Sequence, residues 1–347
     1  MHERPSLLTD YGWNSLLSNR FEALIPRSEQ PGRILRVDRG RCDVAIDSGI
    51  VRADDGRDRL CTGDWVSIAD GPEMHTVTSI LPRTNSVVRS SASGKSERQL
   101  LAANVDTVLI TCAADSDIDL GRIERLLALT WESGATPVIA LTKIDAAQHI
   151  SESLAQLYAV SPGAVVQAVS ARTHEGMDVL DAVLEGTVAI LGSSGSGKST
   201  LANAFTGSGD LRTGRVRDVD GKGRHTTAWR ELIPMSGGRT LIDTPGLRGV
   251  GMWNADDGIG KTFPEIEELI SGCRFSDCSH IAEPGCAVLE AIENGDVDAR
   301  RLASYRKLQK ENEWNASRND LRLQVERAHK MKARSRSLKD LNRVRGR

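Results

Sequence analysis

The sequence lacks any long uninterrupted run of apolar residues. Its apolar runs fall well short of the roughly 20 residues that a membrane-spanning helix needs, and residues 1–14 hold no apolar stretch typical of a signal peptide. We therefore expect a cytoplasmic protein that does not associate with a membrane. Cysteine is also scarce. In a reducing compartment the six cysteines are expected to be metal ligands or core residues rather than disulfide partners.

The sequence also has little net charge, but that charge is unevenly distributed. The whole chain has a formal net charge of −2, whereas residues 321–347 carry ten Lys and Arg side chains against two acidic ones, a local net charge of +8. The preceding 320 residues therefore stand at −10. A basic tail of this kind is typical of a segment that contacts nucleic-acid phosphates. The length of 347 residues favours two or three domains.

One stretch, Thr187-Val-Ala-Ile-Leu-Gly-Ser-Ser-Gly-Ser-Gly-Lys-Ser-Thr200, fits the phosphate-binding pattern G-x-x-x-x-G-K-[ST]. A strand-like run precedes it and a helix can follow, which is the context that the pattern requires. Its glycines let backbone N–H groups point at a polyphosphate at a helix N-terminus. Lys198 is expected to reach the β- and γ-phosphates, and Ser199 to hold Mg²⁺. The predicted nucleotide-binding residues are Gly192, Ser193, Ser194, Gly195, Ser196, Gly197, Lys198, Ser199 and Thr200.

A second SGKS, at residues 93–96, lacks that context because Arg89 stands where the pattern needs its first glycine. The surrounding residues 89–100 are polar and are predicted to form a linker. Residues 1–30 show no sustained hydrophobic period, and their isolated aromatic residues could dock on a neighbour or on nothing. We expect a flexible, partly disordered N-terminal arm there.

Residues 31–88 are predicted to form a small β-barrel of the OB-fold type. Short β-rich runs alternate with Asp- and Gly-containing turns over about 55 residues, which is the size of an OB-fold. An SH3-like barrel is the alternative. OB barrels commonly bind nucleic acid through one face. The sequence does not show that face here, although several arginines are available. The expected strands are residues 34–37, 42–46, 65–68 and 75–81, and the available arginines are Arg33, Arg36, Arg39, Arg41 and Arg52.

Residues 101–252 alternate strand and helix patterns, which predicts an α/β domain with a parallel sheet covered on both faces. A hairpin is expected late in this domain, around the turn at residues 235–238. The predicted strands are residues 105–111, 136–141, 164–169 and the run into the phosphate loop, and the predicted helices are centred on residues 123–131, 151–159, 177–184 and 201–205.

Two loops of this domain carry the chemistry of guanine recognition. Thr142-Lys143-Ile144-Asp145 follows one predicted strand, and Ser170-Ala171 follows the next. The Asp145 carboxylate can accept hydrogen bonds from the N1–H and 2-amino group of guanine, a donor pair that adenine does not offer. The Lys143 stem would lie along the ring, and the backbone at Ser170 and Ala171 would contact the O6 atom.

Two further motifs are predicted to act at the γ-phosphate end of the nucleotide. The first, Arg224-His225-Thr226-Thr227, lies in a segment rich in Gly and basic residues. Thr226 or Thr227 is expected to add a hydroxyl to Mg²⁺, His225 to position the attacking water, and Arg224 to stabilise developing charge. A role of His225 in contacting a partner or phosphate is the alternative.

The second motif is Asp243-Thr244-Pro245-Gly246. Asp243 is placed to support Mg²⁺ through its water shell, and the Gly246 N–H to touch the γ-phosphate. Leu247 follows at the place where Ras-like GTPases carry a Gln that orients water. Because leucine cannot do so, we expect slow intrinsic hydrolysis.

Residues 253–320 are predicted to form an α-helical zinc-binding domain, followed by the basic tail 321–347. The pattern Cys273-x4-Cys278-x-His280-x5-Cys286 supplies three thiolates and one imidazole, a ligand set typical of one tetrahedral structural zinc ion. Helices are expected over residues 287–293 and 297–314, the second capped by Asp296. The remaining cysteines, Cys42, Cys61 and Cys112, are expected to be core residues.

The order of the nucleotide motifs is unusual, because TKID and Ser-Ala precede the phosphate loop instead of following it. This order indicates a circularly permuted GTPase domain. Together with the N-terminal barrel, GRHTT and DTPG, the chain resembles the ribosome small-subunit-dependent GTPases of the RsgA/YjeQ family over nearly its whole length, and the Cys/His pattern matches the zinc motif of that family. One departure is Thr142 where the commonest form has Asn; a hydroxyl makes fewer links to the phosphate loop than an amide.

The resemblance implies a monomeric GTP hydrolase, using GTP/GDP, Mg²⁺ and one structural Zn²⁺, that acts in 30S ribosomal subunit maturation. Binding to 16S rRNA and stimulation by the subunit are also implied. The residues alone indicate a Mg²⁺-dependent GTPase flanked by two modules suited to RNA. One alternative is a GTP-driven metallochaperone, and bound zinc that resists mild chelation would exclude it. A second is an RNA-binding protein with a non-hydrolysing nucleotide site, and multiple-turnover phosphate release would exclude that function.

Overall fold

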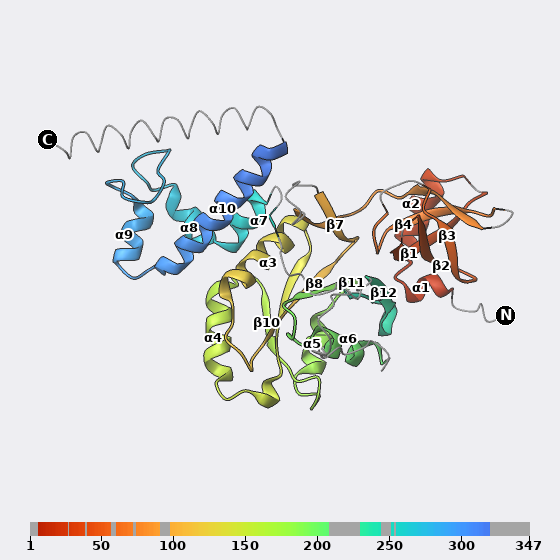
Figure 1. The fold of residues 1–347 in the computed structure, drawn as a ribbon, viewed down its shortest axis with the longest axis horizontal. Coiled ribbons are helices and arrows are strands. Elements are labelled where there is room, and N and C mark those ends of the chain that lie inside the picture. Colours follow the sequence, from red (N-terminus) through yellow and green to blue (C-terminus); the bar gives the residue numbers. More distant parts are fainter. Residues whose placement is uncertain are drawn as a thin grey trace, which may run out of the picture.

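The computed structural model describes residues 6–26, 28–38, 40–56, 60–71, 74–90, 98–207, 230–243, 251–252 and 255–319. Three parts lie side by side in Figure 1, with the GTPase-type α/β domain between an N-terminal barrel and a group of C-terminal helices. None of the helices in the described part of the chain combines the length and the apolar character that crossing a membrane requires. The predicted multidomain architecture is confirmed.

The barrel closes in the order β1-β2-β3-β5-β4, with β3 pairing parallel to β5 and the other pairs antiparallel. This is a five-stranded Greek-key barrel, as the OB-fold prediction requires. Its interior holds its own apolar cluster, which includes Ile34, Val44 and Ile68. The sequence pattern missed the third strand because, apart from the buried Ala53, its side chains are exposed or half-buried. The strands are β1 (Gln30–Asp38), β2 (Arg41–Ile46), β3 (Gly49–Asp54), β4 (Trp65–Ala69) and β5 (His75–Ile80).

The N-terminal segment is ordered over residues 6–26, which corrects the expectation of a flexible arm across residues 1–30. It forms the helices α1 (Leu7–Asp10) and α2 (Ser15–Leu24), and the Asn14 side chain caps the second helix. Trp13 packs edge-on against Trp65 of the barrel, with ring centroids 5.1 Å apart. The isolated aromatic residues of this segment therefore dock on the barrel, and this burial offsets the entropy of ordering the chain.

The segment predicted as a linker, residues 89–100, contributes to an antiparallel pair of strands. These are β6 (Ser86–Ser90) and β7 (Arg98–Ala103). Val87 and Leu101 on this pair are fully buried and belong to the main apolar cluster of the molecule. The polar composition suggested a linker, but the buried apolar residues of the two strands hold them together as a pair.

The central sheet has the strand order β10-β9-β8-β11-β13-β12, parallel except for the β12–β13 hairpin. Helices α3 and α4 cover one face, and α5 and α6 cover the other (Figure 1). The strands are β8 (Thr107–Ala113), β9 (Thr136–Thr142), β10 (Val165–Ala168), β11 (Thr187–Gly192), β12 (Glu231–Pro234) and β13 (Thr240–Asp243). The helices are α3 (Leu120–Ser133), α4 (Ile150–Val160), α5 (Met177–Val183) and α6 (Lys198–Thr206).

Local sequence explains the limits of α3, the helix that carries the C-terminal region. Its first turn is capped by the Asp119 side chain, which accepts a hydrogen bond of 3.0 Å from the Arg122 N–H. It stops at Gly134, whose φ of 80° is the left-handed conformation that glycine adopts at a helix end.

The C-terminal region consists of four helices, α7 (Asp256–Thr262), α8 (Pro264–Ile270), α9 (Ala287–Glu293) and α10 (Ala299–Asn319), within the described residues. The prediction placed α9 correctly and missed the two short helices before it. The cap of α10 also differs from the prediction, because the Asp298 carboxylate and not that of Asp296 accepts from the backbone N–H of Arg300. The buried apolar residues of this region, such as Phe263 and Leu302, belong to the same cluster as those of α3.

A buried guanidinium joins the barrel, the N-terminal helices and the central sheet. Arg33 of β1 is 2% exposed and donates to the Tyr11 carbonyl at 2.6 Å and to the Thr187 hydroxyl at 2.7 Å. Its guanidinium also lies 4.3 Å from the Trp65 ring centroid. Thr187 begins the strand that leads into the phosphate loop, so this contact fixes the barrel at the opposite end of that strand.

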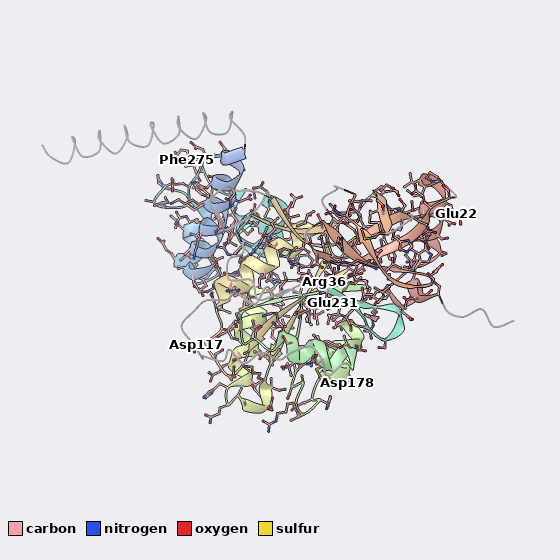
Figure 2. All side chains as sticks on the ribbon, turned by 45° about the vertical axis from the view of Figure 1, so that its right-hand side comes forward. Glu22, Arg36, Asp117, Asp178, Glu231 and Phe275 are labelled. Atoms are coloured by element: carbon pink, nitrogen blue, oxygen red, sulfur yellow. The ribbon has the colours of Figure 1, made fainter. Side chains whose placement is uncertain are left out.

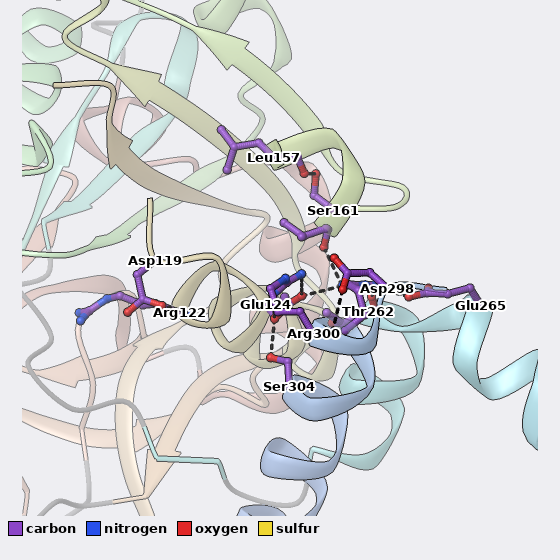
Figure 3. Close-up of polar contacts among 12 residues, drawn as sticks. Asp119, Arg122, Glu124, Leu157, Ser161, Thr262, Glu265, Asp298, Arg300 and Ser304 are labelled. Carbon is purple, nitrogen blue, oxygen red and sulfur yellow. Dashed lines mark hydrogen bonds and ion pairs between the residues drawn. The ribbon is translucent and has the colours of Figure 1, made fainter. Parts of the chain in front are cut away.

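A second buried cluster holds the C-terminal helices on α3 (Figure 3). The Glu124 side chain is fully buried and accepts from Arg300, Arg301 and the Ser304 hydroxyl. Arg301 extends the cluster, donating to Glu265 at 2.8 Å and to the carbonyls of other packed helices. The charged acceptors of this cluster are carboxylates on α3 and α8, so two parts of the chain far apart in sequence are held together by ion pairs.

Candidate nucleotide and metal sites

The predicted phosphate loop connects the end of β11 to the start of α6. Gly192 approaches the neighbouring strand so closely that an added Cβ would lie 2.2 Å from the Thr111 Oγ1. That hydroxyl lies 2.6 Å from the Ser196 Oγ, which in turn donates to the Ser193 carbonyl at 2.9 Å. The Thr111 hydroxyl also lies 3.3 Å from the Leu191 carbonyl, so the two hydroxyls join the end of β8 to the backbone on both sides of Gly192.

Thr142 links the predicted base loop to the phosphate loop. Its hydroxyl lies 2.9 Å from the Ser196 carbonyl and 3.2 Å from the Cys112 carbonyl, so one proton serves two acceptors. An amide at this position would carry two donors. Ser196 is thus held at its side chain by Thr111 and at its carbonyl by Thr142, from two adjacent strands.

Lys198 and Asp243 face the same partly buried space at the carboxyl ends of β11 and β13. The Lys198 ammonium donates to the carbonyls of Gly192 at 3.1 Å and Ser193 at 2.6 Å. Burial lowers the pKa of Lys198, an effect that the nearby Asp243 opposes. Burial likewise raises the pKa of Asp243, and Lys198 opposes that shift. Because burial reduces screening by water, each charge here interacts more strongly with a phosphate or cation than it would at the surface.

The two predicted base-binding loops meet at the ends of β9 and β10. The Ser170 hydroxyl donates to the Asp145 carboxylate at 2.7 Å, and the Ile144 N–H donates to the Val169 carbonyl at 3.5 Å. Ser170 is fully buried, whereas Asp145 keeps part of its side chain open. The structure therefore brings TKID and Ser-Ala together beside the phosphate loop, although the three segments are separate in sequence.

Sequence reasoning missed two residues at the end of β8. Thr111 supports Ser196 as described above, and the Asp115 carboxylate pairs with the Lys143 ammonium at 2.9 Å. Both follow from the placement of β8 between β9 and β11. A polar residue at the end of a buried strand was the available signal, because ligands of open α/β sheets bind outside the carboxyl ends of the strands.

The other predicted residues of the γ-phosphate end lie outside the described residues. They are Arg224, His225, Thr226, Thr227 and Gly246. Within the predicted motifs, Asp243 is described, at the end of β13. Ser199 is half-buried in the first turn of α6, while Ser194, Gly195 and Thr200 are exposed.

The four predicted zinc ligands are brought together in the C-terminal region. One ligand atom from each of Cys273, Cys278, His280 and Cys286 lies within 4.8 Å of the others. The His280 Nδ1 is 3.3 Å from the Cys286 sulfur and 3.6 Å from the Cys273 sulfur. Three sulfurs and one imidazole nitrogen at this spacing fit the donor set of a tetrahedral structural zinc site.

Glu283 organises the loop that carries two of these ligands. Its carboxylate accepts from the Ser279 hydroxyl and from the N–H groups of Ser279, Ile281 and Ala282. These hydrogen bonds, that of the Ser279 hydroxyl above all, hold the pKa of Glu283 well below its usual value. The charged carboxylate therefore fixes the conformation of the loop around His280 through these hydrogen bonds.

The barrel arginines are largely committed to partners within the protein. Arg33 is buried at the junction with the central sheet, and Arg36 and Arg52 pair with carboxylates of Asp38 and Asp43. Arg41 is exposed, and Arg39 lies outside the described residues. These pairs reduce the positive charge that the barrel surface offers to a nucleic acid.

Comparison with known proteins identifies the family of this fold. A family model described as RsgA GTPase matches residues 80–253, and a model described as 50S ribosome-binding GTPase matches residues 187–343. The chain is 48% identical to the small ribosomal subunit biogenesis GTPase RsgA of Streptomyces avermitilis, over 92% of this chain and 89% of that protein. The protein of the same name from Methanosarcina acetivorans is 37% identical, over 92% and 90%.

Two solved structures share the fold. YjeQ from Thermotoga maritima superposes with a TM-score of 0.59 and 23% identity, covering 81% of this chain and 97% of that one. YloQ, described as a circularly permuted GTPase, gives a TM-score of 0.58 and 24% identity, covering 82% and 95%. These two structures show the fold, and the matching family model together with the relatives of 37% and 48% identity shows that the chain belongs to the RsgA GTPase family.

Proposed function

We propose that the chain hydrolyses GTP during maturation of the small (30S) ribosomal subunit, acting as a monomer that binds 16S rRNA and is stimulated by the subunit. The observation that carries this proposal is the meeting of the base loops and the phosphate loop at one edge of the sheet. Its biological setting is supported by relatives that carry the name of a small ribosomal subunit biogenesis GTPase over nine-tenths of the chain. GTPase domains of this family use GTP or GDP with Mg²⁺.

Guanine selection is assigned to Asp145. Its carboxylate would accept from the N1–H and 2-amino group of the base, and the bond from Ser170 orients it for that task. The backbone of Ser170 and Ala171 would contact the O6 atom, while the Lys143 stem would cover the ring. Thr142 and Ile144 hold this loop against the phosphate loop and the end of β10.

The phosphates are assigned to the loop Gly192–Thr200 and the start of α6. Backbone N–H groups there would cradle the β-phosphate, and Lys198 would move from the loop carbonyls to the β- and γ-phosphates. Ser199 would bind Mg²⁺ directly, with a hydroxyl of Thr226 or Thr227, and Asp243 would act through the water shell of the metal. The Gly246 N–H would contact the γ-phosphate.

Hydrolysis is assigned to residues of the first switch. His225 would position the attacking water and Arg224 would stabilise charge that develops on the transferred phosphoryl group. Leu247 has no group that can orient water, so we expect slow turnover in the absence of the subunit. The bond that breaks is the β–γ phosphoanhydride, with GDP and phosphate as products.

The Cys/His cluster is assigned to one structural zinc ion. Cys273, Cys278, His280 and Cys286 would fill all four positions, so the ion would supply folding energy and no open coordination site. This closed ligand set argues against the function of a metallochaperone, because a metallochaperone must release its metal. RNA contacts are assigned to the C-terminal region and to the basic segment 321–347. The place of action is assigned to the cytoplasm, where subunits are assembled.

The test is multiple-turnover phosphate release from GTP, measured with and without purified 30S subunits. We expect a slow rate alone, a higher rate with subunits, and none with Lys198→Ala, in which the charge at the phosphates is lost. A matched control is Lys261→Ala, which removes a lysine from a helix outside the nucleotide site. Phosphate release that does not respond to subunits, or that survives Lys198→Ala, would contradict the proposal.

A further inference from the structure

An acidic residue with no assigned role lies beside the base-binding loop. Asp115 follows β8, in the loop that leads to α3, and its Oδ2 lies 2.9 Å from the Lys143 Nζ. The two side chains are 35% and 38% exposed. Within the described part of the chain, Asp115 is the carboxylate that pairs with this ammonium.

The backbone of Lys143 is itself tightly constrained. Its φ of 59° is in the left-handed region, which a residue with a side chain adopts only where its surroundings hold it. The constraint comes from the short helix η1 (Ile144–Ala146) that starts there, with the Ala146 N–H donating to the Lys143 carbonyl at 3.0 Å. The start of the side chain is therefore fixed, while its four-carbon stem would be free without a tether at the ammonium.

The two carboxylates near the loop have different partners. Asp145 accepts from the buried Ser170 hydroxyl at 2.7 Å, and the Arg172 guanidinium approaches it at 3.8 Å. Asp115 instead holds Lys143 from the loop that follows the neighbouring strand β8. Asp145 is therefore available to bind the base, and Asp115 is available to order the Lys143 side chain.

We propose that Asp115 is a positioning residue for guanine binding, holding the Lys143 ammonium so that the apolar stem lies along the purine ring. The inference rests on the proposed function, in which that stem covers the base. A lysine side chain loses considerable rotamer freedom when it is ordered, and ordering it before the nucleotide arrives improves affinity. The Asp115–Lys143 ion pair also links the base loop to the end of β8. The other link of this loop, from Thr142 to the phosphate loop, is one hydrogen bond from its hydroxyl.

The chemistry of the contact sets the expected signature. A methylene stem meets any purine face equally, so Asp115 should affect affinity and not the choice of base. Base choice should depend on Asp145, which inosine triphosphate, lacking the 2-amino group, engages with one donor instead of two. Because half-exposed ion pairs contribute little, we expect Asp115→Asn to raise the Kd by about 3- to 5-fold.

The experiment measures the Kd of GTP and of inosine triphosphate for the full-length protein with Mg²⁺. Four proteins form a cycle: the parent, Asp115→Asn, Lys143→Met and the double variant. Lys143→Met keeps an apolar stem and removes the charge. We expect Asp115→Asn to weaken both nucleotides by the same factor in the parent, and to have no effect in the Lys143→Met background.

Asp117→Asn is the matched control, because Asp117, labelled in Figure 2, is an exposed aspartate on the same loop. It should leave both Kd values unchanged, and Asp115→Glu should restore part of the lost affinity. An unchanged Kd in Asp115→Asn, an equal loss in both backgrounds, or a changed preference between the nucleotides would overturn the inference. A parent that binds the two nucleotides equally would instead contradict the role of Asp145 in the proposed function.

Discussion

The barrel and the C-terminal helices both pack against the GTPase domain, but they obtain their buried apolar surface in different ways. The barrel encloses a cluster of its own, made by inward-facing residues of all five strands. The buried apolar residues described in α7–α10 belong to the cluster that includes α3. The barrel also contributes Leu35, Ala45 and Trp65 to that larger cluster, but its interior is filled by residues of its own strands. We therefore expect the barrel to depend less on its neighbours for folding than the C-terminal helices do.

The buried arginines at the two junctions also differ, in the charge of the groups that accept their hydrogen bonds. Arg33 donates to a carbonyl and a hydroxyl, which are neutral, and burial lowers its pKa to about 10. Arg301 donates to the carboxylates of Glu124 and Glu265. Removing one member of a buried ion pair leaves a charge without a partner, which costs much more than losing a bond between a charge and a neutral group.

Removal of the proposed zinc ligands is expected to have the largest effect. In the Cys278→Ser, Cys286→Ser double variant the site cannot close, and the free energy of metal binding is lost from folding. We expect zinc to be absent by elemental analysis. Hydrogen exchange should rise across α8–α10 and spread to α3, which packs directly on these helices, while the barrel strands should stay protected by their own interior cluster.

Cys112→Ala, which removes a buried cysteine from β8, serves as the control and should keep its zinc. Stoichiometric zinc in the double variant would show that the cluster is not the site. Equal loss of protection in the barrel would remove the distinction between the two regions.

Breaking the ionic cluster comes next in size. Glu124→Ala leaves Arg300 and Arg301 without their shared carboxylate, and we expect a loss of about 3–5 kcal/mol from the free energy of unfolding of the C-terminal region. Urea titration followed by hydrogen exchange of α10 measures it. Glu293→Ala, on the exposed side of α9, is the control. A loss no greater than that of the control would mean that apolar packing alone holds the region.

Disrupting the contact between α3 and α7 is expected to lower the stability of the protein by an intermediate amount. A Cβ at Gly258 would lie 2.0 Å from the Ala128 carbonyl oxygen, so Gly258→Ala must force the helices apart, at a cost of about 1–3 kcal/mol. Two residues along, a Cβ at Gly260 meets its nearest atom, the Glu267 Cγ, at an ordinary 3.7 Å. Gly260→Ala should therefore stabilise the helix by about 0.5–1 kcal/mol. Thermal unfolding compares the pair, and equal melting temperatures would refute the close packing.

The smallest effect is expected at the barrel junction. Arg33→Met loses two hydrogen bonds and the contact with Trp65, but it also removes a buried charge, so the net loss should be about 1–2 kcal/mol. Arg301→Met should cost more, since it removes a partner of the buried Glu124 carboxylate. The two variants are compared by urea titration, with exchange in α1 and α10 as local probes. Similar losses would show that the character of the acceptors does not matter.

The parts of the fold that follow from local pattern were predictable. Turn residues between β-rich runs indicated the barrel, and the spacing of the residues from Gly192 to Lys198 was enough to indicate the phosphate loop. The pattern at β3 was weak because Ala53 is its one fully buried residue and the others are at least partly exposed. The short helices α7 and α8 gave no sustained period.

The contacts between parts could not be read from the chain. A glutamate in an amphipathic helix ordinarily faces water, so nothing in the sequence marked Glu124 as a fully buried charge at the junction with the C-terminal helices. Arg33 looked like a surface residue of the barrel for the same reason. Asp115 could not be identified because its partner, Lys143, is 28 residues away in sequence, and the two come together only because β8 and β9 are neighbours in the sheet.

The strand order has a mechanical consequence. The chain enters the GTPase domain from the barrel through β8 and leaves toward the C-terminal helices through β13, and β11 alone separates these two strands in the described sheet. Both pair with it in parallel, over five positions on one side and four on the other. A load applied between the barrel and the C-terminal region on a ribosomal subunit would enter at the start of β8 and exit at the end of β13. It would act along the strands, in shear, so that many ladder hydrogen bonds resist together while the strand that ends in the phosphate loop stays in place.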